Sequence, residues 1–319
     1  MSEAAFIALP NVIWVDKDEK KNITKIAKEE WHFRFVGYPH SKIITNKDLC
    51  LEEWERKHFQ PDYVMPATRN YWVADPMLAE DNGKTYLFYE AAHHDKGRIE
   101  VVELYANGTT SQPAVALERE YHLSYPFVFK HDGEWYMIPE SCAIHEVQLL
   151  KATHFPTDWE CVTTLLKENA VDTTVQNVNG KLLLLTFLPQ AGNECVFPKA
   201  FWLDWSDDIK LAEIPWPNFD SLQVRGAGRM LADGRRYVRP AQLNQPMSYG
   251  DGVLFEECRC SDAPYGEKEI GRLLVENLHV PGWKVDGLHT YAATTQFEVI
   301  DIRCQLPDPC KILRKVLYK

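Results

Sequence analysis

Two apolar runs separated by a two-residue turn recur four times along the chain. The copies cover Ala74 to Glu90, Ser124 to Glu140, Val171 to Phe187 and Arg225 to Ala241, and each has Asn-Gly or Asp-Gly between its two runs. A type I′ turn needs positive φ at both central residues, and these dipeptides adopt it readily. Each copy therefore predicts a β-hairpin.

The spacing of these hairpins predicts a repeat architecture. Their turn glycines, Gly83, Gly133, Gly180 and Gly234, lie 50, 47 and 54 residues apart. A period of about 40–50 residues with this strand pattern is typical of the blades of a β-propeller. Further strand-like segments would supply the third and fourth strands of the blades: Arg98–Leu104, Pro113–Glu120, Glu146–Ala152, Trp159–Glu168, Lys199–Trp205 and Gly252–Cys258.

The predicted fold is all-β, a five-bladed β-propeller with a short, partly helical N-terminal extension. Four blades come from the four hairpins. The fifth would come from Gly287–Cys304 or from Trp31–Pro39, because an open ring leaves sheet edges unpaired. Helices are expected only before the first hairpin, at Asn22–Glu30 and Asn46–Lys57.

No segment rich in Gly, Ser or Pro divides the chain, so one domain is expected over residues 1–319. Residues 1–70 would form the extension and a ring-closing strand, and residues 71–319 the blades.

Composition narrows the range of partners. The chain is 45% hydrophobic with a net charge of −11, which suits a globular protein and argues against nucleic acid or an anionic membrane as a partner. No stretch is long and apolar enough for a membrane span, and the N-terminus lacks the basic start of a signal peptide. The eight cysteines form no CxxC pair, which favours a reducing compartment. A cytoplasmic protein is therefore expected.

Aligning the copies on the turn glycine points to a candidate site. Eight residues before it stand Asp75, Tyr125, Asp172 and Gly226, and seven residues after it stand Glu90, Glu140, Phe187 and Ala241. The first strand of a propeller blade lines the central channel, so both ends of each hairpin should open at one mouth. Convergent carboxylates raise one another's pKa, and a glycosidase uses such a pair as acid and base. The alternative is that these acids pair with nearby arginines or bind an ion.

Basic and aromatic residues extend this candidate site. On strand alternation, Arg225 and Arg239 lie at the same level as the acids, where a guanidinium suits a carboxylate, a phosphate or sugar hydroxyls. The alternative for both arginines is a salt bridge to those acids. The residues expected to bind substrate are Glu90, Trp72, Tyr125, Arg225, Arg239, Gln242 and His289.

Several of these segments together resemble a known family. They are WVADPMLAEDNGKTYLFYE, SYPFVFKHDGEWYMIPES, the VDTTV hairpin, RGAGRML with GRRYVRPAQ and YGDGVLFEE, and DGLHTY. This set resembles a domain found at the N-terminus of plant glucosamine inositolphosphorylceramide transferases and in stand-alone bacterial relatives. In this chain the resemblance runs from about Trp72 to about Tyr291. The family is in turn similar to the five-bladed propellers of family 43 glycoside hydrolases.

The resemblance implies roles for three carboxylates. In family 43 enzymes one Asp is the general base, a second Asp adjusts pKa and orientation, and a Glu is the general acid. By this resemblance Asp75 is the base and Asp172 the second Asp. The acid usually comes from the fourth blade, where this chain has Arg225 and Gly226, so Glu140 is expected to replace it, with Glu90 as the next choice.

The predicted function is that of a glycoside hydrolase-like enzyme acting on a glycan or glycoside. The alternatives are a non-catalytic carbohydrate-binding or accessory protein of surface polysaccharide or glycolipid biosynthesis, or a glycosyltransferase-associated domain. No P-loop, GxSxG elbow or HExxH motif is present. No cofactor is expected to be required, although the resemblance allows a structural calcium ion in the central channel near His289.

Overall fold

The computed structural model describes the greater part of the chain after residue 70. The described residues are 64–65, 71–93, 96–107, 109–189, 196–206, 208–216, 219–220, 222–233, 236–245, 248–260, 265–278, 280 and 284–304, with the strand positions 12–14 and 33–35. The chain divides into two compact units. One comprises Met1–Pro61, Glu276–Pro281 and Ala293–Glu298, and the other comprises Asp62–Val275, Gly282–Ala292 and Val299–Lys319.

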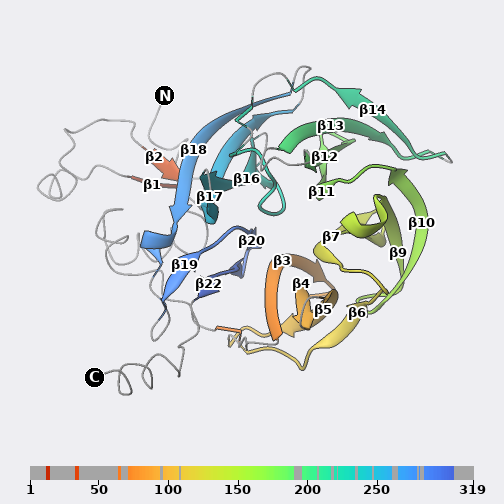
Figure 1. Cartoon of the computed structure of the whole chain (residues 1–319), viewed down its shortest axis with the longest axis horizontal. Helices are drawn as coiled ribbons and strands as arrows, with labels where there is room; N and C mark the ends of the chain where they lie inside the picture. Colours follow the sequence, from red (N-terminus) through yellow and green to blue (C-terminus); the bar gives the residue numbers. More distant parts are fainter. Residues whose placement is uncertain are drawn as a thin grey trace, which may run out of the picture. The chain divides into compact units, whose positions relative to one another are not determined.

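The second unit contains four antiparallel sheets of four strands each, which makes the protein an all-β propeller. In Figure 1 the sheets follow one another in chain order around a common centre. The first two blades are β3 (Tyr71–Asp81), β4 (Lys84–His93), β5 (Lys96–Leu104), β6 (Ala114–Leu117) and β7 (Ser124–His131), β8 (Glu134–Glu140), β9 (Val147–His154), β10 (Asp158–Leu166). The next two are β11 (Val171–Val178), β12 (Lys181–Pro189), β13 (Val196–Asp204), β14 (Lys210–Ile214) and β15 (Leu231–Asp233), β16 (Arg236–Gln245), β17 (Ser248–Arg259), β18 (Gly266–Leu274).

The repeated turns confirm the hairpin prediction for the first three blades. Both central residues have positive φ in each turn: Asn82 and Gly83, Asp132 and Gly133, and Asn179 and Gly180. The fourth turn glycine, Gly234, lies outside the described residues. The strands predicted after each hairpin are also confirmed, as β5, β6, β9, β10, β13 and β17.

Short elements follow the fourth blade. They are the 3-10 turn η4 (Val275–Asn277) and the strands β19 (Val285–Gly287), β20 (Tyr291–Ala293), β21 (Glu298–Ile300) and β22 (Arg303–Cys304). β19 pairs with β22, and β20 with β21, so this segment forms two small sheets instead of one four-stranded sheet. Another 3-10 turn, η3 (Cys142–Ile144), lies in the second blade.

The N-terminal predictions are largely outside the described residues. The two expected helices, Asn22–Glu30 and Asn46–Lys57, both fall there. Within the expected strand Trp31–Pro39, β2 (Phe33–Phe35) pairs with β1 (Val12–Trp14). The single domain expected over residues 1–319 stays a prediction. No helix within the described ranges has the length and apolar character needed to cross a bilayer.

The hydrophobic core lies between neighbouring blades. One cluster joins the first three blades through residues such as Phe88, Phe127 and Leu184. A second includes Phe187 of the third blade and Tyr237 of the fourth. Strands inside such a stack are covered on both faces, so their sequences are continuously apolar, as in Leu182–Leu185 of β12.

A β-bulge interrupts the first strand of the first three blades at the same repeat position. The pairing register shifts between Ala74 and Met77, and equivalently in β7 and β11. The bulge residues Asp75, Tyr125 and Asp172 have positive φ, between 42° and 52°. Such backbone is strained in a residue other than glycine, and bulges redirect a side chain away from the regular alternation. The repeated bulge therefore directs three aligned side chains toward the centre of the ring.

Candidate functional site

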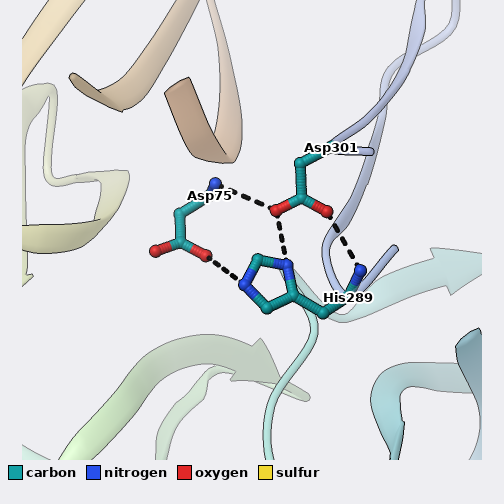
Figure 2. Close-up of side chains that lie close together, drawn as sticks. All are labelled: Asp75, His289 and Asp301. Atoms are coloured by element: carbon teal, nitrogen blue, oxygen red, sulfur yellow. Dashed lines mark hydrogen bonds and ion pairs between the residues drawn. The ribbon is translucent and has the colours of Figure 1, made fainter. Parts of the chain in front are cut away.

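The first part of the site joins the first blade to residues 285–304, the segment after the fourth blade that we call the closing segment (Figure 2). The Asp75 side chain faces His289, with 3.7 Å between Asp75 Oδ1 and His289 Nε2. On the other side of the imidazole ring, His289 Nδ1 lies 2.5 Å from Asp301 Oδ2. Thr290 Oγ1 donates to Asp75 Oδ1 at 3.1 Å, and the backbone N–H of Tyr125 donates to Asp75 Oδ2 at 3.2 Å. Asp75, on the first blade, is thus held by the second blade and by the closing segment.

The second part of the site is organised by Arg225 of the fourth blade. Its Nε donates to Asp172 Oδ2 at 2.5 Å, and its Nη2 lies 3.9 Å from Glu140 Oε2. The backbone N–H of Asp172 also donates to Glu140 Oε2, at 3.1 Å. The guanidinium of Arg225 lies 5.6 Å from the Tyr249 ring, which contacts the His289 ring edge-on at 5.2 Å. Through Tyr249 the two parts of the site adjoin.

Burial sets the protonation of the two central aspartates. It raises the pKa of Asp75 to about 7, with His289 acting in the opposite direction and Asp301 adding to the rise. It raises the pKa of Asp172 to about 6, opposed by Arg225. A carboxyl whose pKa lies near neutrality can both accept and release a proton at working pH. This is the property expected of an acid–base group.

The pKa values of His289 and Asp301 are shifted in the directions that favour an ion pair between the two side chains. Burial acts to lower the pKa of His289, but the carboxylates of Asp301 and Asp75 outweigh it and raise that pKa to about 9. Burial acts to raise the pKa of Asp301, but His289 outweighs it and the pKa of Asp301 is lowered. At neutral pH the imidazole is positively charged and Asp301 is ionised.

Tyr125 and Gln242 have partners that connect blades or strands. The Tyr125 hydroxyl accepts a hydrogen bond of 2.8 Å from the backbone N–H of Gly228, so this buried side chain links the second blade to the fourth. Gln242 is also buried, and its Nε2 donates to the Gly226 carbonyl at 2.8 Å. Both residues, expected to bind substrate, use these polar groups within the protein.

Arg239 is buried and pairs with a glutamate of its own blade. Its side chain is 2% exposed, and Nε and Nη2 donate to the two carboxylate oxygens of Glu267 at 2.5 and 2.8 Å. The guanidinium also lies over the rings of Phe187 and Trp216, at 5.5 and 5.4 Å. The guanidinium of Arg239 is therefore occupied by Glu267 and these two rings.

Glu90 is buried and pairs with a histidine. Its Oε1 lies 3.0 Å from His122 Nε2, while the backbone N–H of Gly97 donates to His122 Nδ1 at 3.0 Å. His122 thus lies between the first blade's Gly97 and Glu90. Trp72, on β3 three residues before Asp75, is 39% exposed.

Three residues of the site were missed by the sequence analysis. Asp301 and Thr290 lie in the closing segment, where no turn glycine gives a repeat register. Tyr249 belongs to the YGDG segment, which was noted only as part of a resemblance. Polar residues near the start and end of the short strands β20 and β21 were the available signal for Asp301 and Thr290.

Gly226 explains why the fourth blade carries no acid at the aligned position. A Cβ atom there would lie 3.0 Å from Asp172 Cβ and 3.1 Å from both the Tyr125 hydroxyl and the Phe187 ring. Only glycine fits without displacing these groups. The neighbouring Arg225 is the residue of this part of the chain that contacts Asp172 and Glu140.

We expect Gly226→Ala to destabilise the protein by about 1–3 kcal/mol, because the added methyl group overfills the space beside Asp172. Urea denaturation at neutral pH measures this change. Gly271→Ala is the matched control, since the nearest atom to its Cβ position is 3.9 Å away. It should cause no loss, and equal losses in the two variants would show that the space around Gly226 is not limiting.

The residues at the centre do not fit the expected calcium ion. Asp75, His289 and Asp301 each have a ligand atom within 4.8 Å of the others. Calcium takes six to eight oxygen ligands. This set offers two carboxylates and an imidazole, and both imidazole nitrogens already face those carboxylates.

Comparison with known proteins supports the resemblance to a transferase family. Residues 63–195 match the family described as glucosamine inositolphosphorylceramide transferase 1, N-terminal. The chain is 37% identical to the Arabidopsis thaliana protein of that name over 112 residues, which are 34% of this chain and 15% of that protein. With the protein of Oryza sativa subsp. japonica it shares 35% identity over 183 residues, which are 54% of this chain and 24% of that protein. The matched part thus spans about a quarter or less of these relatives. The match confirms the expected resemblance for residues 63–195.

A shorter part of the chain is similar to a protein of a different class, a peptidase. The chain is 41% identical over 54 residues to a bifunctional D-Ala-D-Ala dipeptidase and D-Ala-D-Ala carboxypeptidase of Enterococcus gallinarum. This similarity covers 17% of the chain and 25% of that protein.

Solved structures agree with the fold. A thermostable family-43 glycoside hydrolase superposes with a TM-score of 0.54 at 12% identity, over 77% of this chain and 94% of that one. An α-L-arabinofuranosidase from Lactobacillus brevis superposes with a TM-score of 0.53 at 14% identity, over 78% of this chain and 89% of that one. At such identities the likeness concerns the fold alone.

Proposed function

We propose, on the premise that residues 63–195 match the N-terminal domain of glucosamine inositolphosphorylceramide transferase 1, that this propeller is a glycoside hydrolase-like enzyme. It would cleave a glycosidic bond of a glycan or glycoside at the mouth of the ring. The observation that carries the proposal is the convergence of Asp75, Glu140 and Asp172, from three blades, on the two basic side chains of His289 and Arg225.

The closing segment would be the fifth blade of this propeller. Strands β19 to β22 follow the fourth blade, and His289, Thr290 and Asp301 within this segment bond to Asp75 or to each other. A segment in this place would cover the otherwise open edges of the first and fourth blades.

Asp75 is the group best suited to proton transfer. It is buried, its pKa is raised to about 7, and its backbone is held in a strained left-handed conformation. Strained residues of this kind cluster at active sites. As general base it would activate a water molecule, while Glu140, whose side chain is 14% exposed, would protonate the leaving oxygen. Asp172, held by Arg225, would orient the substrate.

The experiment is a screen of the wild-type protein against glycans and aryl glycosides, with product anomers identified by NMR. Inversion at the anomeric carbon would agree with water attack assisted by Asp75, whereas retention would make one carboxylate a nucleophile. Absence of any cleavage across the screen would contradict the enzymatic proposal.

A non-catalytic carbohydrate-binding protein is the second candidate. Arg225 contacts both Asp172 and Glu140, so the guanidinium and these two carboxylates form a charged, hydrogen-bonding group that can bind sugar hydroxyls without any proton transfer. This candidate predicts saturable glycan binding without turnover, measured by isothermal titration calorimetry. Arg225→Met should then weaken binding, whereas in the enzyme it should mainly alter the pH dependence of the rate.

A further inference from the structure

Asp301 is the most fully hydrogen-bonded carboxylate of the candidate site. Its Oδ1 accepts the backbone N–H of His289 at 3.0 Å and that of Thr290 at 2.8 Å. Its Oδ2 faces His289 Nδ1 at 2.5 Å and accepts the backbone N–H of Asp75 at 3.2 Å. Each oxygen thus has two partners, and together they fix the position and the ring orientation of His289 (Figure 2).

The environment of His289 favours its charged form on geometric grounds. Both ring nitrogens face carboxylate oxygens, one on Asp301 and one on Asp75. A neutral imidazole has a single N–H, so only the protonated ring can direct N–H groups to both. Three further groups act on the ring: the Thr290 hydroxyl, 3.3 Å from Nδ1, the Asp172 carboxylate and the edge-on ring of Tyr249.

We propose that Asp301 is a positioning residue that holds the His289 imidazole against Asp75, so that a side chain of the protein supplies the positive charge at the centre of the ring. This inference rests on the proposed function only in the role given to Asp75. It replaces the calcium ion expected at this place, for which the three residues are a poor ligand set.

The proposal gives His289 an effect on Asp75 that depends on Asp301. A positive charge close to a buried carboxylate favours its ionised form and so limits the rise of its pKa. Without the Asp301 carboxylate, His289 would lose the charged partner of its Nδ1–H, leaving the neutral Thr290 hydroxyl beside it, and with that partner much of its tendency to be protonated. Asp75 would then remain protonated to higher pH.

The test is Asp301→Asn, in which the amide oxygen can still accept the backbone N–H groups of His289 and Thr290. NMR titration of the His289 ring should give a pKa near 9 in the wild type and a value at least one unit lower in the variant. Asp286→Asn is the matched control, since Asp286 lies in the same segment but pairs with the exposed Arg303. It should leave the His289 titration unchanged.

Three outcomes would overturn the proposal. One is an unchanged His289 titration in a folded Asp301→Asn variant. Another is an equal shift in Asp286→Asn. The third is a rise in the thermal midpoint of the wild type with added calcium that Asp301→Asn abolishes, because the three side chains would then be metal ligands.

The NMR readout is independent of turnover, so the two proposals fail separately. If no glycan is cleaved and the His289 titration still shifts, the enzymatic function is wrong and the positioning role holds. If an activity is found, Asp301→Asn should also move the acidic limb of its pH–rate profile to higher pH. A uniform loss of rate with an unmoved profile would indicate a structural role only.

Discussion

Replacing Asp75 with asparagine is expected to stabilise the protein while removing the proposed glycoside turnover. Burial raises the pKa of this carboxyl from 3.8 to about 7, so its ionised form destabilises the folded state. One pKa unit corresponds to about 1.4 kcal/mol, and loss of the attraction to His289 offsets part of the gain. We expect a net gain of about 1–3 kcal/mol above pH 7.

The pH dependence of this gain follows from the raised pKa. With a folded pKa above the unfolded one, the Asp75 carboxyl stabilises the fold fully below about pH 4, and that contribution is lost as the pH rises to about 7. Asparagine does not titrate. The difference in thermal midpoint between variant and wild type should therefore be larger at pH 8 than at pH 5.

The rate effect should be larger than the stability effect. Removal of a general base lowers turnover by about 10²–10⁴-fold, and asparagine cannot accept the proton. Asp132→Asn is the matched control, because Asp132 also has positive φ but lies in an exposed turn. Full turnover in Asp75→Asn, or a gain in stability that is equal at the two pH values, would contradict the role given to Asp75.

Arg239→Met should be the most destabilising substitution among those considered. Arg239 is 2% exposed and forms two hydrogen bonds with Glu267, so its removal leaves a buried carboxylate without its cation. Breaking such a pair costs about 3–5 kcal/mol. The free energy of unfolding, measured by urea denaturation at pH 7, should fall by that amount.

Two further variants distinguish the destabilisation caused by an unpaired buried charge from that caused by lost side-chain packing. Arg239→Met combined with Glu267→Gln should recover part of the loss, because the uncompensated carboxylate is removed. Arg272→Met breaks the pair with Glu269, which is half-exposed, and should change stability by less than about 1 kcal/mol. Similar losses for Arg239→Met and Arg272→Met would show that the burial of the Glu267 pair is unimportant.

The blades were predictable because their signals are local. Asn-Gly and Asp-Gly turns between apolar runs depend only on neighbouring residues, and the φ values of Asn82 and Gly83 agree with that reading. Alignment of the copies on their turn glycine also placed Asp75 and Asp172 at equivalent positions, and side chains at equivalent positions of a repeat point in the same direction.

The remaining features depend on contacts between distant parts of the chain. Strand alternation assigned Arg239 to the level of the acids, but its partner Glu267 lies two strands away in the same blade. Asp301 is 226 residues from Asp75, in a segment of two small sheets with no repeat register. No periodicity in the sequence reports such a contact.

The hydrogen bond between Asp75 and Asp301 also has a kinetic meaning. The two residues are 226 positions apart, so this contact has a high sequence separation and a large loop to close. At a synthesis rate of about 5–20 residues per second, roughly 10–50 s pass between the emergence of the first partner and that of the second. The sheets can form one by one as the chain is made, but Asp75 meets Asp301 only after the segment that contains Asp301 has been synthesised, so a chain stopped before that point would lack this contact.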